Sequence, residues 1–328
     1  MDAFHSDHKP ILLCTDSELK RFYRRGRPFR FEAMWVKDDS CEQVIQDSWG
    51  TIRLATSVWG FNNKLRSVQD NLQTWNCQSF GHVCNSLAKK LKELKVVEES
   101  GGYFSDPTRV YLLRTKIEQL KSKEECMWKQ RSCSARLKEG DRNTSYFHCK
   151  ATQRNKRNLI FGLEDEAGQW VDEEEDLGRV VEAYFQNMFT SSNPSQFEEI
   201  LVGLQSVITA EMSASLSCEY QAEEVLLALK QMAPLTALGP DGMSPIFYKT
   251  YWHIIGEDVI SIVLNALNSG MVHESLNSTF IALIPKVENP KRVVEFRLIS
   301  LCNVVYKLIA KVVVNRLKKI LTHVIDDS

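Results

Sequence analysis

The C-terminal part of the fold is decided by Phe280-Ile-Ala-Leu-Ile-Pro-Lys286 and, ten residues on, Phe296-Arg-Leu-Ile-Ser-Leu-Cys-Asn-Val-Val-Tyr-Lys307. The first run is apolar and rich in β-forming residues, and it ends at a proline followed by a lysine. The second run begins with an arginine between apolar neighbours and continues into a strongly helical segment. The polar stretch 287–295 contains a proline and suits a loop. We therefore expect a strand, a loop, a second short run and then a helix over 304–325.

This arrangement would hold Lys286 and Arg297 near each other at the mouth of a cleft. An arginine binds two phosphate oxygens at once and a lysine acts as a point charge, so the pair is suited to gripping a polyphosphate. The alternative is two ordinary surface cations beside a buried strand. The spacing alone leaves both interpretations open.

Four motifs of the last hundred residues stand in a particular order: Gly239-Pro-Asp-Gly242, Phe247-Tyr-Lys-Thr-Tyr-Trp252, Leu283-Ile-Pro-Lys286 and Phe296-Arg-Leu-Ile-Ser-Leu-Cys-Asn-Val304. They resemble the start, or fingers region, of the reverse transcriptase domain in plant LINE-type non-LTR retrotransposon polyproteins. The resemblance implies that the lysine and the arginine contact the incoming nucleotide triphosphate, and that the intact enzyme uses Mg²⁺. The chain departs from the family pattern at Leu298, Thr236 and Leu238, which indicates drift away from function.

The resemblance also implies that the catalytic part is missing. Nucleotidyl transfer needs carboxylates that hold two metal ions, which the family places on strands of the palm. The Asp-Asp pairs of this sequence are Asp38-Asp39 and Asp326-Asp327, and the second pair follows a helix rather than lying on a hairpin. We expect an inactive fragment without a bound cofactor.

Near the N-terminus, Asp7 and His8 precede the apolar run Ile11-Leu-Leu-Cys14. An Asp-His pair before a strand is compatible with a general base or a metal site, although a lone exposed pair is weak evidence. It resembles the closing motif of the apurinic-type endonuclease domain of these polyproteins. That likeness implies that Asp7 helps to bind metal and His8 contacts the scissile phosphate. The other metal-binding carboxylates are absent, so we interpret the pair as a remnant.

Apolar residues recur at steps of three to five over residues 65–99, which predicts one long amphipathic helix. A second helix is expected from Asp106 to Met127, with Pro107 at its first position. Two such helices joined by a short turn should form an antiparallel hairpin. Their apolar stripe is a core or a partner seam, and helix-mediated self-association is one option.

The strongest chemical signal of nucleic-acid binding lies between Arg136 and Arg157. This segment contains seven basic and two acidic residues, a net charge of +5. Aromatic side chains interleaved with cations can stack on unpaired bases while the cations contact phosphates. The alternative is a solvated basic face with Tyr146 and Phe147 in the core. Residues 128–160 also resemble the plant LINE linker. The aromatic candidates are Tyr146, Phe147 and His148, and the candidate cations are Lys138, Arg142, Lys150, Arg154, Lys156 and Arg157.

The segment from Glu164 to Glu224 has the opposite character, with fifteen acidic residues against Arg179. A β-hairpin predicted over 159–171 overlaps the start of this segment. Further helices are expected over 177–189, with Met188 among its buried residues, and over 222–232 and 247–267.

The total charge, the cysteine pattern and the lack of long apolar runs limit the classes of protein to which the chain can belong. The chain of 328 residues has 41 basic and 42 acidic residues, so its total charge predicts no partner. Nine scattered cysteines without a Cys-x-x-Cys pair indicate reduced thiols. We see no signal peptide and no apolar run long enough for a bilayer, and expect an intracellular chain, nuclear or cytoplasmic, that binds RNA or DNA but neither a membrane nor a small-molecule cofactor.

The predicted architecture is mainly α with minor β: a long antiparallel helical hairpin, a small β-hairpin and an incomplete α/β fingers region. We divide the chain into an endonuclease remnant (1–15), a helical linker (16–195) and the fingers part of a reverse transcriptase (196–328). The predicted function is that of a truncated, inactive retrotransposon reverse transcriptase with residual nucleic-acid binding. A host-retained helical scaffold or RNA-binding protein is the alternative.

Overall fold

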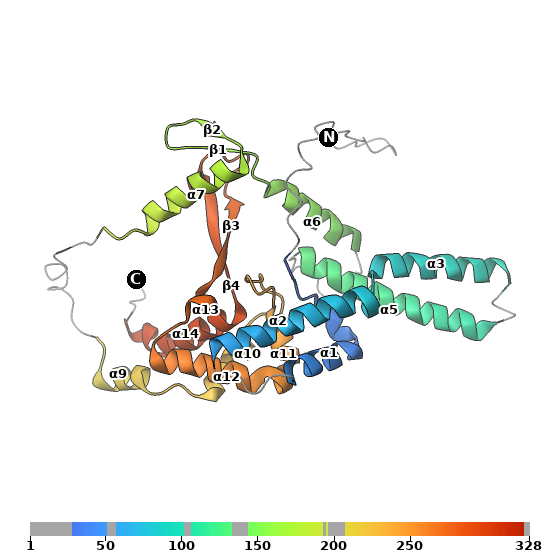
Figure 1. Cartoon of the computed structure of the whole chain (residues 1–328), viewed down its shortest axis with the longest axis horizontal. Helices are drawn as coiled ribbons and strands as arrows, with labels where there is room; N and C mark the ends of the chain where they lie inside the picture. The colour runs from blue at the N-terminus through green and yellow to red at the C-terminus, as the bar shows by residue number, and fades with distance from the viewer. Residues whose placement is uncertain are drawn as a thin grey trace.

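The computed structural model describes residues 28–50, 57–101, 106–132, 144–192, 195 and 207–324. It is mainly helical with two small antiparallel sheets, which confirms the predicted fold class. In Figure 1 the α3–α5 helical hairpin projects from one side, and the β3–β4 hairpin rises from a layer that contains α10, α12 and α14.

The predicted helical hairpin is confirmed, although the prediction for its first arm was wrong in one respect. The long helix expected over 65–99 is two helices, because a π-helical turn and Gly81, in the left-handed region with φ 71°, interrupt it. His82 then caps the next helix by accepting from the Asn85 N–H. Pro107 begins the second arm, as expected. The bounds are α2 (Val58–Trp75), η3 (Asn76–Phe80), α3 (Val83–Glu99) and α5 (Pro107–Ser132).

One apolar core joins elements from both sides of position 195. Phe31 packs edge-on against Phe247 with the ring centroids 5.3 Å apart. The Trp49 indole N–H donates to Asp258 at 2.8 Å, and the Lys64 ammonium reaches the same carboxylate oxygen at 2.8 Å. The N-terminal elements of this core are η2 (Ala33–Lys37) and α1 (Asp39–Gly50). The domain limits at 15 and 195 stay predictions.

The C-terminal helices form the other side of that core. The helix predicted over 247–267 is split at Tyr251 into two, while the helices over 222–232 and 304–325 are found close to their expected limits. The bounds are α9 (Ala210–Ser217), α10 (Ala222–Gln231), α11 (Pro245–Thr250), α12 (Trp252–Ser269), α13 (Glu274–Asn277) and α14 (Val304–Val324).

The predicted β-hairpin over 159–171 is present, and the strand expected at 280–286 pairs with residues 296–302 in a larger β-hairpin, one face of which helix α7 covers. Phe185 of α7 is buried with Leu163 and Phe296, whereas Met188 is 53% exposed, so its expected burial was wrong. The bounds are β1 (Leu163–Glu164), β2 (Trp170–Val171), α7 (Glu174–Phe189), β3 (Thr279–Pro285), η4 (Val293–Glu295) and β4 (Phe296–Cys302).

The turn at Gly239-Pro-Asp-Gly242 ties distant segments together. Gly242 has φ 63°, and a Cβ there would lie 2.0 Å from the Phe29 carbonyl oxygen, so only glycine fits. The backbone N–H of Asp241 donates to the Asn303 side chain at 3.1 Å. The segment near Phe29, the turn and the start of α14 are thereby held in one place.

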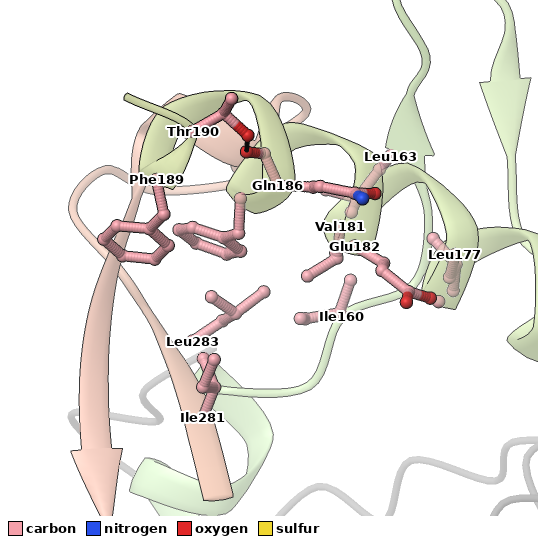
Figure 2. A pocket seen from close by; sticks show the side chains of 12 residues that line it. Ile160, Leu163, Leu177, Val181, Glu182, Gln186, Phe189, Thr190, Ile281 and Leu283 are labelled. Atoms are coloured by element: carbon pink, nitrogen blue, oxygen red, sulfur yellow. Dashed lines mark hydrogen bonds between the residues drawn. The ribbon is translucent and has the colours of Figure 1, made fainter. Parts of the chain in front are cut away.

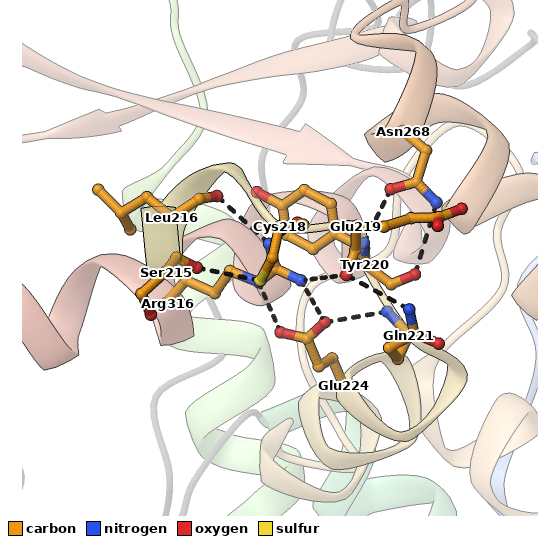
Figure 3. Close-up of polar contacts among 9 residues, drawn as sticks. All are labelled: Ser215, Leu216, Cys218, Glu219, Tyr220, Gln221, Glu224, Asn268 and Arg316. Atoms are coloured by element: carbon orange, nitrogen blue, oxygen red, sulfur yellow. Dashed lines mark hydrogen bonds and ion pairs between the residues drawn. The ribbon is translucent and has the colours of Figure 1, made fainter. Parts of the chain in front are cut away.

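Arg316 of α14 clamps the segment between α9 and α10 (Figure 3). Its side chain is buried, and its guanidinium makes two bonds of 2.7 Å to the two carboxylate oxygens of Glu224. The guanidinium also lies 3.5 Å from the centroid of the Tyr220 ring. The remaining N–H groups donate to the backbone carbonyls of Leu216, Cys218 and Glu219. This arginine is a structural residue because its donors are used.

Candidate nucleic-acid interface

Helix α6 (Thr144–Arg157) carries the described part of the basic segment and packs against α5. Phe147 anchors it, because its side chain is 2% exposed. Tyr146 is half-buried, with its ring edge-on to Phe147 at 5.8 Å. The ammonium of Lys150 lies 5.8 Å from the centroid of the Tyr146 ring.

Three cations of α6 lie on one side of the helix. With 100° per residue, Lys150, Arg154 and Arg157 fall within an arc of about 60°, whereas Lys156 points to the opposite side. All four side chains are exposed, and none forms an ion pair with another residue that the structure describes. We call Lys150, Arg154 and Arg157 the α6 stripe. Its donors are available to a ligand.

The expected interleaving of aromatic and basic side chains is only partly formed. Burial of Phe147 removes it from any stacking surface, in agreement with the core alternative for that residue. Tyr146 is the aromatic side chain that lies beside the α6 stripe. Lys138 and Arg142 lie outside the described residues, so their position relative to the stripe stays a prediction.

The β3–β4 register places Lys286 and Arg297 on the same face of the hairpin. Arg297 is paired with Ile284, and the Lys286 N–H donates to the Glu295 carbonyl at 2.8 Å, which makes the two cations diagonal neighbours. The Lys286 ammonium donates to the Val294 carbonyl at 2.8 Å, whereas Arg297 is exposed. Binding a triphosphate would therefore require Lys286 to exchange a backbone carbonyl for phosphate. Its role, like that of Arg297, stays a prediction.

The remaining carboxylate candidates do not assemble within the described part of the chain. Asp7, His8 and the Asp326-Asp327 pair lie outside it. Asp38 instead pairs with Lys123 at 2.9 Å just before α1. Across residues 28–50, 57–101, 106–132, 144–192 and 207–324, no three His, Cys, Asp or Glu side chains are grouped to hold a metal. The cysteines in these ranges are free thiols. Within the same ranges, no helix is long and apolar enough to cross a membrane.

One cluster of titratable groups was missed from the sequence, where its motif indicated only a turn. Burial raises the pKa of Asp241 to about 6, although the Met243 N–H and the charge of Lys307 favour the carboxylate. Burial also lowers the pKa of Lys307, whose ammonium donates to the Ala237 carbonyl at 2.6 Å. The Tyr248 hydroxyl is buried nearby without a hydrogen-bond partner in the described structure. The order Gly-Pro-Asp-Gly was the available signal, but the tertiary neighbours of its aspartate could not be read from it.

Comparison with known proteins gives one informative match. The chain is 26% identical over 187 residues to the "Transposon TX1 uncharacterized 149 kDa protein" of Xenopus laevis. The match covers 56% of this chain and 14% of the relative, so the chain corresponds to a small part of that protein's length. No family model matches the chain. The comparison supports a transposon origin.

Proposed function

We propose that the chain derives from a LINE-type non-LTR retrotransposon protein of the reverse transcriptase class, and that its own activity is binding nucleic acid rather than transferring nucleotides. Its transposon relative and the order of its C-terminal motifs support the origin. The α6 stripe supports the binding activity, and it is the observation on which the proposal rests.

The chemistry of the α6 stripe favours contacts with phosphates. Arg154 and Arg157 offer planar sets of donors that match phosphate oxygens, and Lys150 adds a point charge. Along the helix axis the three cations are separated by about 6 Å and about 4.5 Å, which suits successive contacts along one strand. Contacts of this kind carry little sequence information, so we expect binding that depends on charge rather than sequence.

A second candidate function is triphosphate binding at Lys286 and Arg297. The shared face of the β3–β4 hairpin favours it, because one ligand can reach both side chains from the same side. Arg297 is the stronger anchor, since Lys286 already donates to a backbone carbonyl. A calorimetric titration with a Mg²⁺-bound nucleoside triphosphate tests it, and unchanged binding in Arg297→Ala would reject it.

The experiment for the main proposal measures fluorescence anisotropy of a labelled single-stranded RNA at fixed moderate salt. The test variant is Lys150→Ala/Arg154→Ala/Arg157→Ala. A matched control, Lys89→Ala/Lys92→Ala/Lys116→Ala, removes three exposed cations that form no ion pair with described residues of the α3–α5 hairpin. Lys156→Ala is a second control within α6.

We expect the test variant to lose at least tenfold in affinity, since three phosphate contacts disappear. The hairpin control should stay within about twofold of the wild-type chain, although it loses the same charge. Equal losses in the two triple variants would mean that binding follows net charge alone, and the assignment to α6 would then be wrong.

A further inference from the structure

An apolar groove lies between α7 and the β3–β4 hairpin (Figure 2). Its volume is about 710 Å³. Leu283 and Ile281 of β3 form one wall, and Val181 of α7 lies on the other. Phe185 of α7 also lines the groove. Phe189 at the end of α7 is 68% exposed, so the groove is open to solvent. Apolar surface of this extent is a candidate docking site.

The α7 side of this groove is strongly acidic. Residues 164–190 contain nine acidic side chains and one basic side chain, Arg179, a net charge of −8. Arg179 itself pairs with Asp176 at 2.8 Å. Glu182 is exposed and lines the groove directly. A partner of this groove should therefore present an apolar ridge flanked by cations.

Helix α14 presents such a ridge. Its buried face packs into the core, but a second apolar row lies on its exposed side. The spacing of this row is three, four and three residues, which aligns the side chains along about 15 Å of helix. The exposed fractions of its two central residues are 39% for Leu317 and 40% for Leu321. We call this set the α14 row: Val314, Leu317, Leu321 and Val324.

The charge of α14 is opposite to that around the groove. The helix contains five basic residues and no acidic residue. Arg316 is already bonded to Glu224, but Lys318 is exposed beside the α14 row and Lys311 lies half-buried on the same flank, whereas Lys319 is on the opposite side of the helix. An apolar ridge with flanking lysines complements an apolar groove with an acidic rim in both shape and charge.

We propose that the chain self-associates head to tail, with the α14 row of one copy bound in the α7–β3 groove of a second copy. The length of the row is close to that of α7 from Leu177 to Phe189, about 18 Å. Within a single copy, α14 stays packed against α10 and α12 and is clamped by Arg316, so its row is not available to the groove of the same copy. The proposal is independent of nucleic-acid binding.

The contact is heterologous, since two different surfaces meet. Four aliphatic anchors in one groove bury less than the roughly 1,600 Å² of a standard stable interface, so we expect affinity in the micromolar range. The charge complementarity should make the association weaker as salt rises.

Analytical ultracentrifugation of the full chain without nucleic acid, from roughly 1 to 100 µM, tests the proposal. The row variant is Leu317→Asp/Leu321→Asp, and the groove variant is Phe189→Asp/Ile281→Asp. All four side chains are exposed, so both variants should fold, which circular dichroism and urea unfolding can verify. The control is Val96→Asp/Leu112→Asp on the α3–α5 hairpin, where both side chains are also exposed.

We expect the average mass of the sedimenting species to increase with concentration for the wild-type chain and the control. Each variant alone should remain monomeric. An equimolar mixture of the row variant and the groove variant should form a dimer that grows no further, because one intact row meets one intact groove. A wild-type chain that is monomeric throughout would overturn the proposal. A groove variant that still dimerises would overturn it in favour of pairing between two α14 helices.

Discussion

Arg316 of α14 and Arg154 of α6 are the same residue type on two amphipathic helices, yet they have opposite surroundings. The guanidinium of Arg316 is bonded to a carboxylate and to backbone carbonyls, and its side chain is 6% exposed. Arg154 is exposed and has no ion-pair partner in the described structure. A buried arginine whose donors are used stabilises the fold, whereas an exposed one with unused donors is available for a ligand.

The largest effect should come from Arg316→Met. The change leaves Glu224 without its cation and removes the donors to three backbone carbonyls, so the free energy of unfolding should fall by roughly 3–5 kcal/mol. Urea unfolding at neutral pH measures this. Arg154→Met is the matched control, and a loss in that variant as large as in Arg316→Met would abolish the contrast.

The same reasoning applies to Lys64 and the exposed lysines. In Lys64→Met, the buried Asp258 keeps the Trp49 N–H but loses the ammonium at 2.8 Å. We expect unfolding to become easier by roughly 2–4 kcal/mol. Lys90→Met breaks a more exposed pair with Glu93 and should change stability by less than about 1 kcal/mol. Equal values for both variants in urea unfolding would contradict this account.

Asp241 differs from both arginines, because it is an acidic group whose burial is not compensated by a close ion pair. Its pKa is about 6 in the folded chain and 3.8 as the reference value, so the folded state holds the proton more tightly. Stability should therefore fall as pH rises between these values, by roughly 1–3 kcal/mol. Asp241→Asn keeps the acceptor for the Met243 N–H and should remove this pH dependence. The free energy of unfolding of the wild-type chain and of Asp241→Asn is measured across about pH 4–7. Two curves that run parallel over this range would refute the prediction.

The smallest effect on stability should come from the α6 stripe. Each of Lys150→Ala, Arg154→Ala and Arg157→Ala should change the free energy of unfolding by less than about 0.5 kcal/mol, since no described partner is lost. Thermal unfolding of each single variant measures this. A loss above about 1 kcal/mol in any of them would show that the cation has a structural role.

Local signals in the sequence predicted much of the fold. Pro107 marked the start of α5, and the proline-bounded run ending at Lys286 predicted β3. The break at 76–82 was missed because the apolar steps of three to five continue across it, although Gly81 was a signal that could have found it. Local patterns give element type, and they overlook interruptions that preserve the pattern.

The sites were less predictable because their partners are distant in sequence. Arg316 lies in the predicted helix over 304–325, but its bond to Glu224, 92 residues away, could not be read from that local pattern. For Lys286 the sequence left a phosphate contact and an ordinary surface cation both open, and it gave no sign that the amine would donate to the Val294 carbonyl. The exposure of Arg154 and Arg157 could not be read from helical spacing either, because they follow the buried Phe147 by seven and ten residues on the same side of α6, and both are nevertheless exposed.

The most direct test of the central claim is the salt dependence of RNA binding by the wild-type chain and the Lys150→Ala/Arg154→Ala/Arg157→Ala variant. Each phosphate contact to a single strand contributes about 0.7 to the slope of log affinity against log salt. If the α6 stripe makes three such contacts, the slope of the variant should be shallower by about 2. An unchanged slope, with or without a change in affinity, would show that these cations do not contact phosphate, and the account of α6 as the binding surface would be wrong.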